Sequence, residues 1–359
     1  MIGIDLFSGA GGMSVGATMA GVRVVLAIEA EPNSALTYKR NHPNVDVIQK
    51  DIRLIHSAGL NVFNPIRKLR KREPIIVFGG PPCQGFSTSN QRTRSADNPT
   101  NWLFREYLRI VSTIRPDWVV FENVRGILET DNGRFFQQVL NELSLLRYAT
   151  SHWVLNAKDF QVAQDRARLF IVGSRSGCYV PMPQSMSGKP ITVKEAIADL
   201  PVVENGASES VLPYSRSAHS EYAKAMRGQL NQCANHIVSR NAKYILQRYR
   251  HIRQGGNWES IPQRLMTNYA DRYRCHTGIY YRLRSNEPSI VIGNFRKNML
   301  VHPWQNRGLS VREAARLQSF PDWYEFTGSI GFQQQQVGNA VPPRLAKAVF
   351  KAIFASDQE

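Results

Sequence analysis

Cysteine is scarce in this 359-residue chain, and the cysteines present are not spaced for bridging or metal binding. Cys83, Cys178, Cys233 and Cys275 are scattered, with neither a Cys-x-x-Cys pair nor a cluster of His and Cys ligands. This distribution argues against a disulfide framework and against a zinc site, and it is typical of proteins in a reducing compartment. We therefore expect no metal cofactor.

Long apolar runs are also missing, and no signal peptide precedes the first strand-like segment. No apolar stretch is long enough to cross a bilayer. These absences predict a soluble intracellular protein without a membrane partner.

Acidic residues are few: 28 Asp and Glu stand against 45 Lys and Arg, a net charge of +17. Residues 211–310 contain 16 Lys or Arg and only 4 Asp or Glu, a difference of 12. Such a concentration indicates nucleic-acid binding, although a solvated basic face is the alternative. The short basic run 66–73 is interpreted as a solvated loop, with a phosphate contact as its alternative. Aromatic residues suited to stacking or groove insertion are interleaved with the basic ones: Tyr244, Tyr249, Trp258, Tyr269, Tyr273, Tyr280, Tyr281 and Phe295.

The chain is organised around the stretch 75–87. Its apolar start, residues 75–78, predicts a buried strand that stops at two glycines. Pro81 and Pro82 then stiffen the turn, so that Cys83 is presented beyond the carboxyl end of the strand, where open α/β sheets bind ligands. A lone cysteine is usually a small buried hydrophobe, but a buried structural cysteine needs neither the prolines nor the polar loop that follows. We interpret Cys83 as a nucleophile.

The first fifty residues have the order of a nucleotide-binding βαβ unit. A strand over residues 2–7 runs into the glycine-rich turn 8–12, and a helix is predicted to about residue 21. A second strand ends on Glu29, where an acidic side chain commonly accepts hydrogen bonds from ribose hydroxyls. The turn is not the G-x-G-x-x-G fingerprint, but with Glu29 and the segment 50–52 it predicts an adenosine-containing ligand.

Three further charged residues are predicted at this site. Glu122 follows a buried strand and projects from the same sheet edge as Cys83. Burying a glutamate is costly without a partner, so a functional role is favoured over a structural ion pair. Arg166 and Arg168 are two residues apart beside a strand, which predicts that they share a face. Together they could hold a phosphate or a base edge, although arginines facing solvent are equally common.

The remaining segments set the domain organisation. The polar segment 87–101 predicts a functional loop, often a lid, before a helix over residues 102–114. Regular βα alternation ends near residue 178. Ser310 and Glu313 form a capping box, and an amphipathic helix follows Asn339. We predict an α/β, Rossmann-like domain from residues 1–177 and 306–359, and a smaller, mostly irregular or β domain at 178–305.

Six motifs in this order resemble those of the C5-cytosine-specific DNA methyltransferases, in particular bacterial or phage restriction-modification enzymes. The resemblance covers nearly the whole chain except its middle segment. The motifs are Asp5-Leu-Phe-Ser-Gly-Ala-Gly-Gly12, Gly80-Pro-Pro-Cys-Gln-Gly-Phe-Ser87, Glu122-Asn-Val124, Gln164-Asp-Arg-Ala-Arg168, Arg312-Glu-Ala-Ala-Arg-Leu-Gln-Ser-Phe-Pro321 and Val337-Gly-Asn-Ala-Val-Pro342.

The resemblance implies a covalent mechanism on cytosine. Cys83 matches the nucleophile that adds to C6 of the base, which activates C5 toward the methyl group of S-adenosylmethionine. Glu122 matches the residue that holds and protonates N3. Arg168 would contact O2, with Arg166 beside it in support.

The resemblance also implies binding residues. The target atom lies inside duplex DNA, so the cytosine must be flipped out, and the segment 84–101 would close over it. The implied substrate-binding residues are Gln84, Ser87, Ser89 and Asn123. The implied cofactor-binding residues are Phe7, Gly9, Ala10, Gly11, Gly12, Glu29, Ala30, Asp51, Ile52, Pro82, Leu103 and Asn339. The middle domain would recognise the target sequence.

The chain departs from the family pattern at three places outside the catalytic set, namely Gln161-Val-Ala163, Asn98-Pro-Thr-Asn-Trp102 and Ser289-Ile-Val-Ile292. Two alternatives remain open. One is a tRNA cytosine methyltransferase of the same fold, and the other is a catalytically decayed relative that still binds DNA. By analogy we expect a cytoplasmic monomer whose partners are double-stranded DNA and, functionally, a cognate restriction endonuclease.

Overall fold

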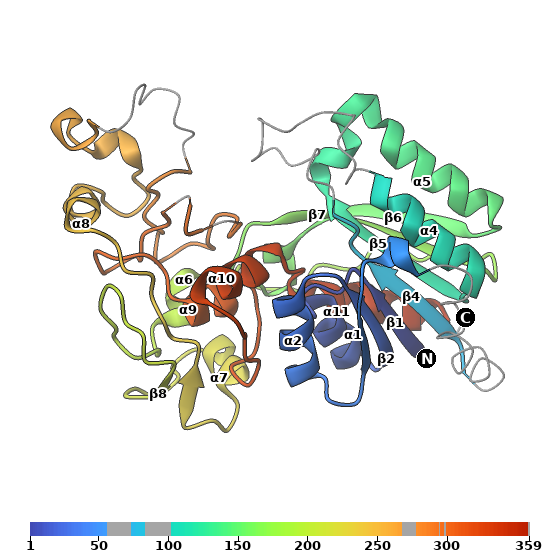
Figure 1. Ribbon diagram of the computed structural model, residues 1–359, viewed down its shortest axis with the longest axis horizontal. Helices are drawn as coiled ribbons and strands as arrows, with labels where there is room; N and C mark the ends of the chain where they lie inside the picture. Colours follow the sequence, from blue (N-terminus) through green and yellow to red (C-terminus); the bar gives the residue numbers. More distant parts are fainter. Residues whose placement is uncertain (56–72, 83–101, 268–277, 294, 298, 358–359) are drawn as a thin grey trace. The chain divides into compact units, whose positions relative to one another are not determined.

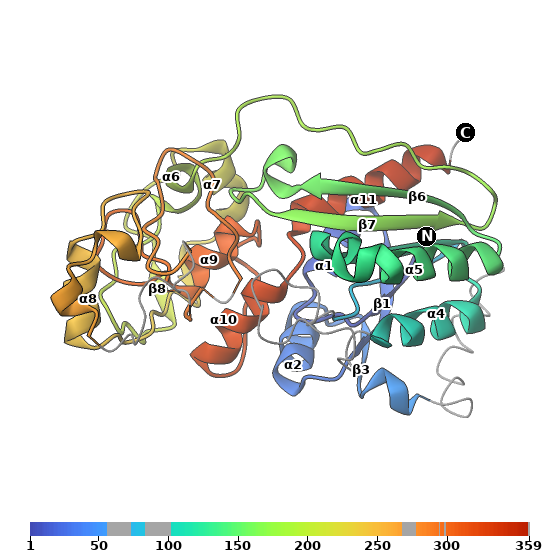
Figure 2. The same cartoon turned by 90° about the horizontal axis from the view of Figure 1, so that it is seen from above.

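The computed structural model describes residues 1–55, 73–82, 102–267, 278–293, 295–297 and 299–357. These residues form two compact units. The first contains residues 1–160, 167–186 and 343–359, and the second contains residues 161–166 and 187–342. Figures 1 and 2 show the elements of both units.

A twisted sheet of seven strands forms the centre of the described part of the first unit. The strands are β1 Ile2–Leu6, β2 Arg23–Glu29, β3 Asp46–Gln49, β4 Ile75–Gly79, β5 Trp118–Val124, β6 Ala149–Asn156 and β7 Ala167–Ser174. Their order is β3-β2-β1-β4-β5-β7-β6. The first five strands are parallel, whereas β7 is antiparallel to both of its neighbours. The order reverses between β1 and β4, the point at which open α/β sheets bind ligands.

Helices cover both faces of this sheet (Figures 1 and 2). The α-helices of this unit are α1 Gly12–Ala20, α2 Pro32–Asn41, α4 Leu103–Ile114, α5 Arg134–Leu145 and α11 Pro343–Ser356. Its 3-10 helices are η1 Ile52–Leu54, η5 Arg125–Leu128, η6 Thr130–Gly133 and η7 Ala157–Phe160. Successive residues of β4 point to opposite faces, so Val77 joins the apolar cluster of α4 and α5, whereas Phe78 meets Phe350 of α11, ring centroids 5.1 Å apart.

The C-terminal helix lies directly against the first helix. A Cβ added at Gly16 of α1 would lie 2.5 Å from both the Cβ of Ala346 and the carbonyl oxygen of Pro343. Only a residue without a side chain permits this approach. The C-terminal helix therefore covers the sheet face beside the first helix.

The second unit consists of short elements joined by irregular segments. Its α-helices are α6 Val193–Ile197, α7 Glu221–Arg227, α8 Lys243–Arg250, α9 Val311–Leu317 and α10 Ile330–Asn339. Two 3-10 helices, η8 Trp258–Ser260 and η9 Gln263–Leu265, and the paired strands β8 Val211–Pro213 and β9 Gln232–Ala234 complete the described elements. The predicted capping box is confirmed: Ser310 and Glu313 satisfy each other's backbone N–H groups at the start of α9.

Buried arginines hold this irregular unit together. Arg282 donates to the carbonyl oxygens of Tyr249, Ile252, His302 and Gln305. Arginines 248, 307, 312 and 316 are also buried and bond to backbone or acidic oxygens. Backbone groups that lack partners in a helix or sheet must be satisfied in another way, and a guanidinium offers five donors.

The basic charge of the segment 211–310 is therefore partly structural. Arg248, Arg282 and Arg307 belong to this segment but are buried. The same correction applies to the interleaved aromatics: Tyr249, Trp258, Tyr280 and Phe295 are buried, so they are core residues and do not offer stacking surfaces. Tyr244 is exposed, whereas Tyr269 and Tyr273 lie outside the described residues.

The boundary between the units also differs from the predicted one. The second unit contains residues 161–166 and 187–342, whereas we expected 178–305. The ion pairs of α9 explain the difference. Arg316 donates to Asp199 and to Asp322, at 2.5 and 2.6 Å, and these buried bonds join α9 to segments on both sides of it in sequence. No polarity change in the sequence marks this join.

Candidate active site

The turn after β1 brings the backbone of residues 7–12 to the carboxyl edge of the sheet. Phe7 has φ 57° and Gly9 has φ 54°, and Gly11 caps α1 with φ 85°. Positive φ is routine for glycine and costly for phenylalanine, and such strain is concentrated at functional sites. The backbone N–H of Ser8 donates to the Ile28 carbonyl oxygen at 3.1 Å, which ties the turn to the end of β2.

Glu29 lies beside this turn and is held by backbone donors. Its Oε2 accepts from the N–H of Gly9 and its Oε1 from the N–H of Glu31, both at 2.7 Å. Burial raises the pKa of Glu29, and the two backbone hydrogen bonds oppose that rise. Ala30, the next residue, is exposed. A carboxylate fixed in this way can also accept bonds from the hydroxyl groups of a ligand.

Ser8 provides a direct indication that the turn suits a polar ligand. The residue is buried, and its Oγ has no hydrogen-bond partner among the described residues. Buried polar atoms are nearly always paired, so an orphaned hydroxyl needs an explanation. A polar ligand bound on this turn would supply the missing partner.

The predicted adenine contacts follow the neighbouring strand. Glu29 pairs in register with Gln49, so Asp51 leaves β3 at the same sheet edge. Hydrogen bonds from Arg53 hold the pKa of Asp51 below its usual value. Ile52 is buried beneath it.

Two glycines shape the end of β4. A Cβ at Gly79 would lie 2.1 Å from the Leu6 carbonyl oxygen, and a Cβ at Gly80 would lie 2.6 Å from Oε2 of Glu122. Glycine at position 80 thus leaves room for the Glu122 carboxylate beside the backbone that leads to Cys83.

Asn123 braces the same backbone. Its Nδ2 donates to the Pro81 carbonyl oxygen at 3.3 Å, and its Oδ1 accepts from the Val124 N–H at 2.8 Å. The side chain is buried. Asn123 was expected to contact substrate, but these main-chain bonds make it a positioning residue in this structure.

Glu122 and Arg168 form a buried ion pair. Arg168 Nε lies 3.1 Å from Glu122 Oε1, and their side chains are 13% and 11% exposed. The antiparallel pairing of β5 with β7 produces this contact, because Val124 lies opposite Arg168. Burial lowers the pKa of Arg168, and the charge of Glu122 opposes that shift.

Arg166 has different surroundings from Arg168. It belongs to the second unit, where its guanidinium donates to the carbonyl oxygens of Ile292, Gly338 and Ala340. The expectation that the two arginines act together on one face is therefore replaced by a structural function for Arg166. The sequence spacing failed here because Arg166 precedes the first residue of β7.

The other predicted residues are placed as follows. Pro82 is exposed and is the last described residue before the gap, Leu103 is the first residue of α4, and Asn339 is the exposed last residue of α10 in the second unit. Cys83, Gln84, Ser87 and Ser89 lie outside the described residues, as do Asn98 and Pro99.

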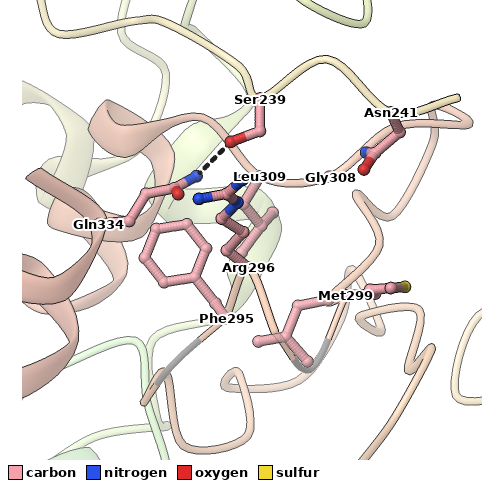
Figure 3. Close-up of a pocket in the computed structure, with 9 residues that line it drawn as sticks. Ser239, Asn241, Phe295, Arg296, Met299, Gly308, Leu309 and Gln334 are labelled. Carbon is pink, nitrogen blue, oxygen red and sulfur yellow. Dashed lines mark hydrogen bonds between the residues drawn. The ribbon is translucent and has the colours of Figure 1, made fainter. Parts of the chain in front are cut away.

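A small pocket in the second unit contains none of the predicted site residues (Figure 3). Its lining is Ser239, Asn241, Phe295, Arg296, Met299, Leu300, Gly308, Leu309 and Gln334. Gln334 Nε2 donates to Ser239 Oγ at 3.0 Å, whereas the buried Oε1 of Gln334 has no partner among the described residues. The lining suits a small hydrogen-bonding group, and it includes no chemistry for group transfer.

The sequence reasoning missed one polar group of the first unit. Asp5 lies inside β1 and is bonded to Ser14 of α1. An acidic residue within a strand that is otherwise apolar was a usable signal, because a buried carboxyl requires a partner.

Among the described helices, none combines the length and apolar character needed to cross a bilayer.

Comparisons with known proteins agree with this geometry. The model of the C-5 cytosine-specific DNA methylases matches residues 1–355. Type II methyltransferase M1.HphI of Haemophilus parahaemolyticus is 36% identical over 98% of this chain and 86% of its own length. Type II methyltransferase M.DdeI of Desulfomicrobium norvegicum is 33% identical over 98% of this chain and 88% of its own.

Solved structures give the same result. A protein encoded within an E. coli prophage, crystallised as a candidate DNA modification methyltransferase, aligns over the whole of both chains. The TM-score is 0.79 and the identity 26%. This fold, the motif order and the family match over 355 residues lead to one conclusion: the chain belongs to the C-5 cytosine-specific DNA methylases.

Proposed function

We propose that this protein transfers a methyl group from S-adenosylmethionine to C5 of a flipped-out cytosine in a short duplex DNA sequence, through a covalent bond between Cys83 and C6. The observation that carries the proposal is the buried Glu122–Arg168 ion pair, which Gly80 admits beside the backbone leading to Cys83. It combines an acid and a hydrogen-bond donor at the sheet edge where ligands bind.

The roles follow from the electronics of cytosine. Glu122 holds a proton at N3, which draws electrons from C6, and Arg168 donates to O2. The Cys83 thiolate adds to C6, and the displaced electron pair makes C5 nucleophilic. After C5 is methylated, a base removes its proton, the bond between C6 and sulfur breaks, and the thiolate is restored. Asn123 supports this site through its bond to the Pro81 carbonyl oxygen.

The cofactor site fits the turn after β1. S-adenosylmethionine supplies an electrophilic methyl group when bound. Glu29 accepts hydrogen bonds from the ribose hydroxyls, and the orphaned Oγ of Ser8 offers a further contact. The backbone of Phe7 and of residues 9–12 approaches the ligand. The adenine region is assigned to Asp51 and Ile52, and the other residues assigned to the cofactor are Ala30, Pro82, Leu103 and Asn339.

Duplex DNA contacts are assigned to the second unit, which retains exposed positive charge although several arginines are buried. Exposed basic residues in its described part include Arg240, Lys243, Arg250, Arg253, Arg264, Arg284, Arg296 and Lys297. Such side chains contact phosphates and release counterions on binding. Gln84, Ser87 and Ser89 are assigned to the DNA and the flipped base, and residues 84–101 to the loop that closes over it.

The names of the relatives, Type II methyltransferases, support a role in restriction-modification. We assign a functional pairing with a cognate endonuclease and activity as a monomer in the bacterial cytoplasm. Analytical ultracentrifugation of the purified protein with a short duplex tests whether it acts as a monomer.

The test of the function uses purified protein, cofactor with a tritiated methyl group, and three acceptors: plasmid DNA, tRNA and DNA lacking cytosine. Incorporation into plasmid DNA alone is expected. Incorporation into tRNA alone would establish the tRNA alternative, and DNA binding without incorporation into either acceptor would establish a decayed relative.

A further inference from the structure

A carboxyl group lies in the interior of the first unit, inside the strand that leads to the cofactor turn. Asp5 is 1% exposed, and its neighbours across the sheet are Ala27 of β2 and Phe78 of β4. Burying a carboxyl among such groups is costly without hydrogen bonds. The reaction described above gives Asp5 no role.

Two hydroxyl groups connect this carboxyl to the adjoining helices. Ser14 Oγ of α1 donates to Asp5 Oδ2 at 2.6 Å, and Ser14 Oγ and the Tyr38 hydroxyl of α2 are also 2.6 Å apart. Ser14 and Tyr38 are both fully buried. The chain of bonds therefore joins β1, α1 and α2 in a part of the molecule that water does not reach.

The residues joined by these two hydrogen bonds flank the cofactor-binding segments in sequence. The turn 7–12 lies between Asp5 and Ser14 in sequence, and Glu29 lies at the end of β2, just before α2. We propose that Asp5, acting through Ser14 and Tyr38, is the residue that positions the turn 7–12 and Glu29 for S-adenosylmethionine. The proposal rests on the cofactor site assigned above and adds to it a residue that does not touch the ligand.

The charge state of Asp5 is part of its action. Burial raises the pKa of Asp5 to about 8, the nearby charge of Glu29 adds to the rise, and the bond from Ser14 opposes it. Among the described residues, two further titratable groups lie near it, Tyr38 of α2 and Tyr107 of α4. Burial raises the pKa of Tyr107 well above its usual value. Asp5 is therefore neutral at pH 7, and Glu29 can carry its charge without a second carboxylate nearby.

Ionisation of Asp5 disturbs the site. Above pH 8 a second negative charge develops near Glu29, which opposes the charged form that accepts from the Gly9 N–H. The affinity for the cofactor should fall. By linkage, cofactor binding should raise the pKa of Asp5 by the same free energy.

Calorimetric titration of the full-length protein with S-adenosylmethionine between pH 6.5 and 9.5 tests the proposal. The wild type should lose about tenfold in affinity across pH 8. Asp5→Asn, which keeps an acceptor but cannot ionise, should lose clearly less affinity than the wild type across this range, because the amino group of the ligand still titrates but residue 5 does not. Asp5→Ala should bind more weakly at every pH. Asp46→Asn, which changes an exposed carboxylate of β3, should follow the wild type.

Equal pH slopes in the wild type and Asp5→Asn would overturn the proposal. If Asp5→Asn does not fold, infrared spectroscopy of the wild type tests the proposal instead. A neutral buried carboxyl group has a carbonyl stretching band, which should disappear near pH 8 as Asp5 ionises. With cofactor bound, the band should persist to higher pH. If the band disappears at the same pH with and without cofactor, the proposal would also be overturned. No cofactor binding at any pH, with the band titrating normally, would instead contradict the proposed function.

Discussion

Arg168 Nε and Glu122 Oε1 lie 3.1 Å apart in the interior of the first unit, on adjacent antiparallel strands. The arginine keeps the carboxylate fixed in place. Each partner thus orients the other before any base is bound.

Glu122→Gln keeps the shape of this side chain and one acceptor oxygen but removes its acid. We expect kcat for methyl transfer to fall about 100-fold or more, with little change in cofactor affinity. Single-turnover kinetics with a methylatable duplex measure the chemical step. Glu129→Gln, at an exposed glutamate near Arg125, is the matched control and should retain wild-type rates. Unchanged single-turnover rates in Glu122→Gln would show that Glu122 does not act as an acid in the reaction.

Gly80→Ala tests the space that admits this carboxylate. The added Cβ would lie 2.6 Å from Oε2 of Glu122, so the carboxylate must move. A displacement of this kind should lower kcat about tenfold or more while the circular dichroism spectrum stays unchanged. Gly308→Ala, where the nearest atoms are 3.8 Å from the new Cβ, serves as control. Equal activity of the two variants would show that the site tolerates the shift.

The contact between α1 and α11 predicts a stability effect without a catalytic one. In Gly16→Ala the Cβ meets Ala346 and the Pro343 carbonyl at 2.5 Å, and such overpacking costs about 1–3 kcal/mol. Gly331→Ala in α10 has its nearest atom at 3.5 Å, and it should leave stability unchanged or raise it by up to about 1 kcal/mol. Urea denaturation of both variants measures the difference. A Gly16→Ala protein as stable as the wild type would contradict this packing.

His302 makes the second unit sensitive to acid. Burial lowers its pKa to about 4, and its Nδ1 accepts from the N–H groups of Trp304 and Gln305. The unfolded state gains a proton near pH 6.5 whereas the folded state does so only near pH 4. The contribution of His302 to stability should therefore fall by about 3 kcal/mol as the pH drops through this window and stay constant above it.

His302→Gln should weaken this pH dependence by the contribution of His302, leaving those of His42 and His236, whose pKa values burial also lowers. His251→Gln, at an exposed position after α8, should leave it unchanged. Glu313 acts in the same direction at lower pH. Burial alone would raise its pKa, but Arg307 holds it well below the usual range, so its contribution is lost below about pH 4.5. Thermal unfolding followed between pH 4 and pH 8 measures these effects, and identical curves for the wild type and His302→Gln would contradict the assignment.

The candidate site at this sheet edge could be predicted from sequence because its signals are local. Glycines at the end of one buried strand and an acidic residue at the end of another indicate which edge of a parallel sheet binds the ligand. Glu29 is the last residue of β2, as this pattern predicts, whereas Glu122 lies inside β5, which continues to Val124. The capping box at Ser310 was equally local.

The second unit could not be read in this way. Charge composition does not distinguish an arginine on a surface from one such as Arg282, which satisfies backbone carbonyls in the interior. The partner of Arg316 is Asp199, 117 residues away, and no periodicity connects them. Arg166 was misjudged for a related reason, since its bonds go to carbonyls more than 120 residues further along the chain.

Bisulfite sequencing of plasmid DNA from cells that express the wild-type protein or Cys83→Ser tests the central claim most directly. We predict cytosines protected within one short sequence in the wild-type sample, and none in the Cys83→Ser sample although that protein still binds DNA. Protection that persists in Cys83→Ser, or its absence in cells that express the wild-type protein, would contradict methylation of cytosine C5 through this cysteine.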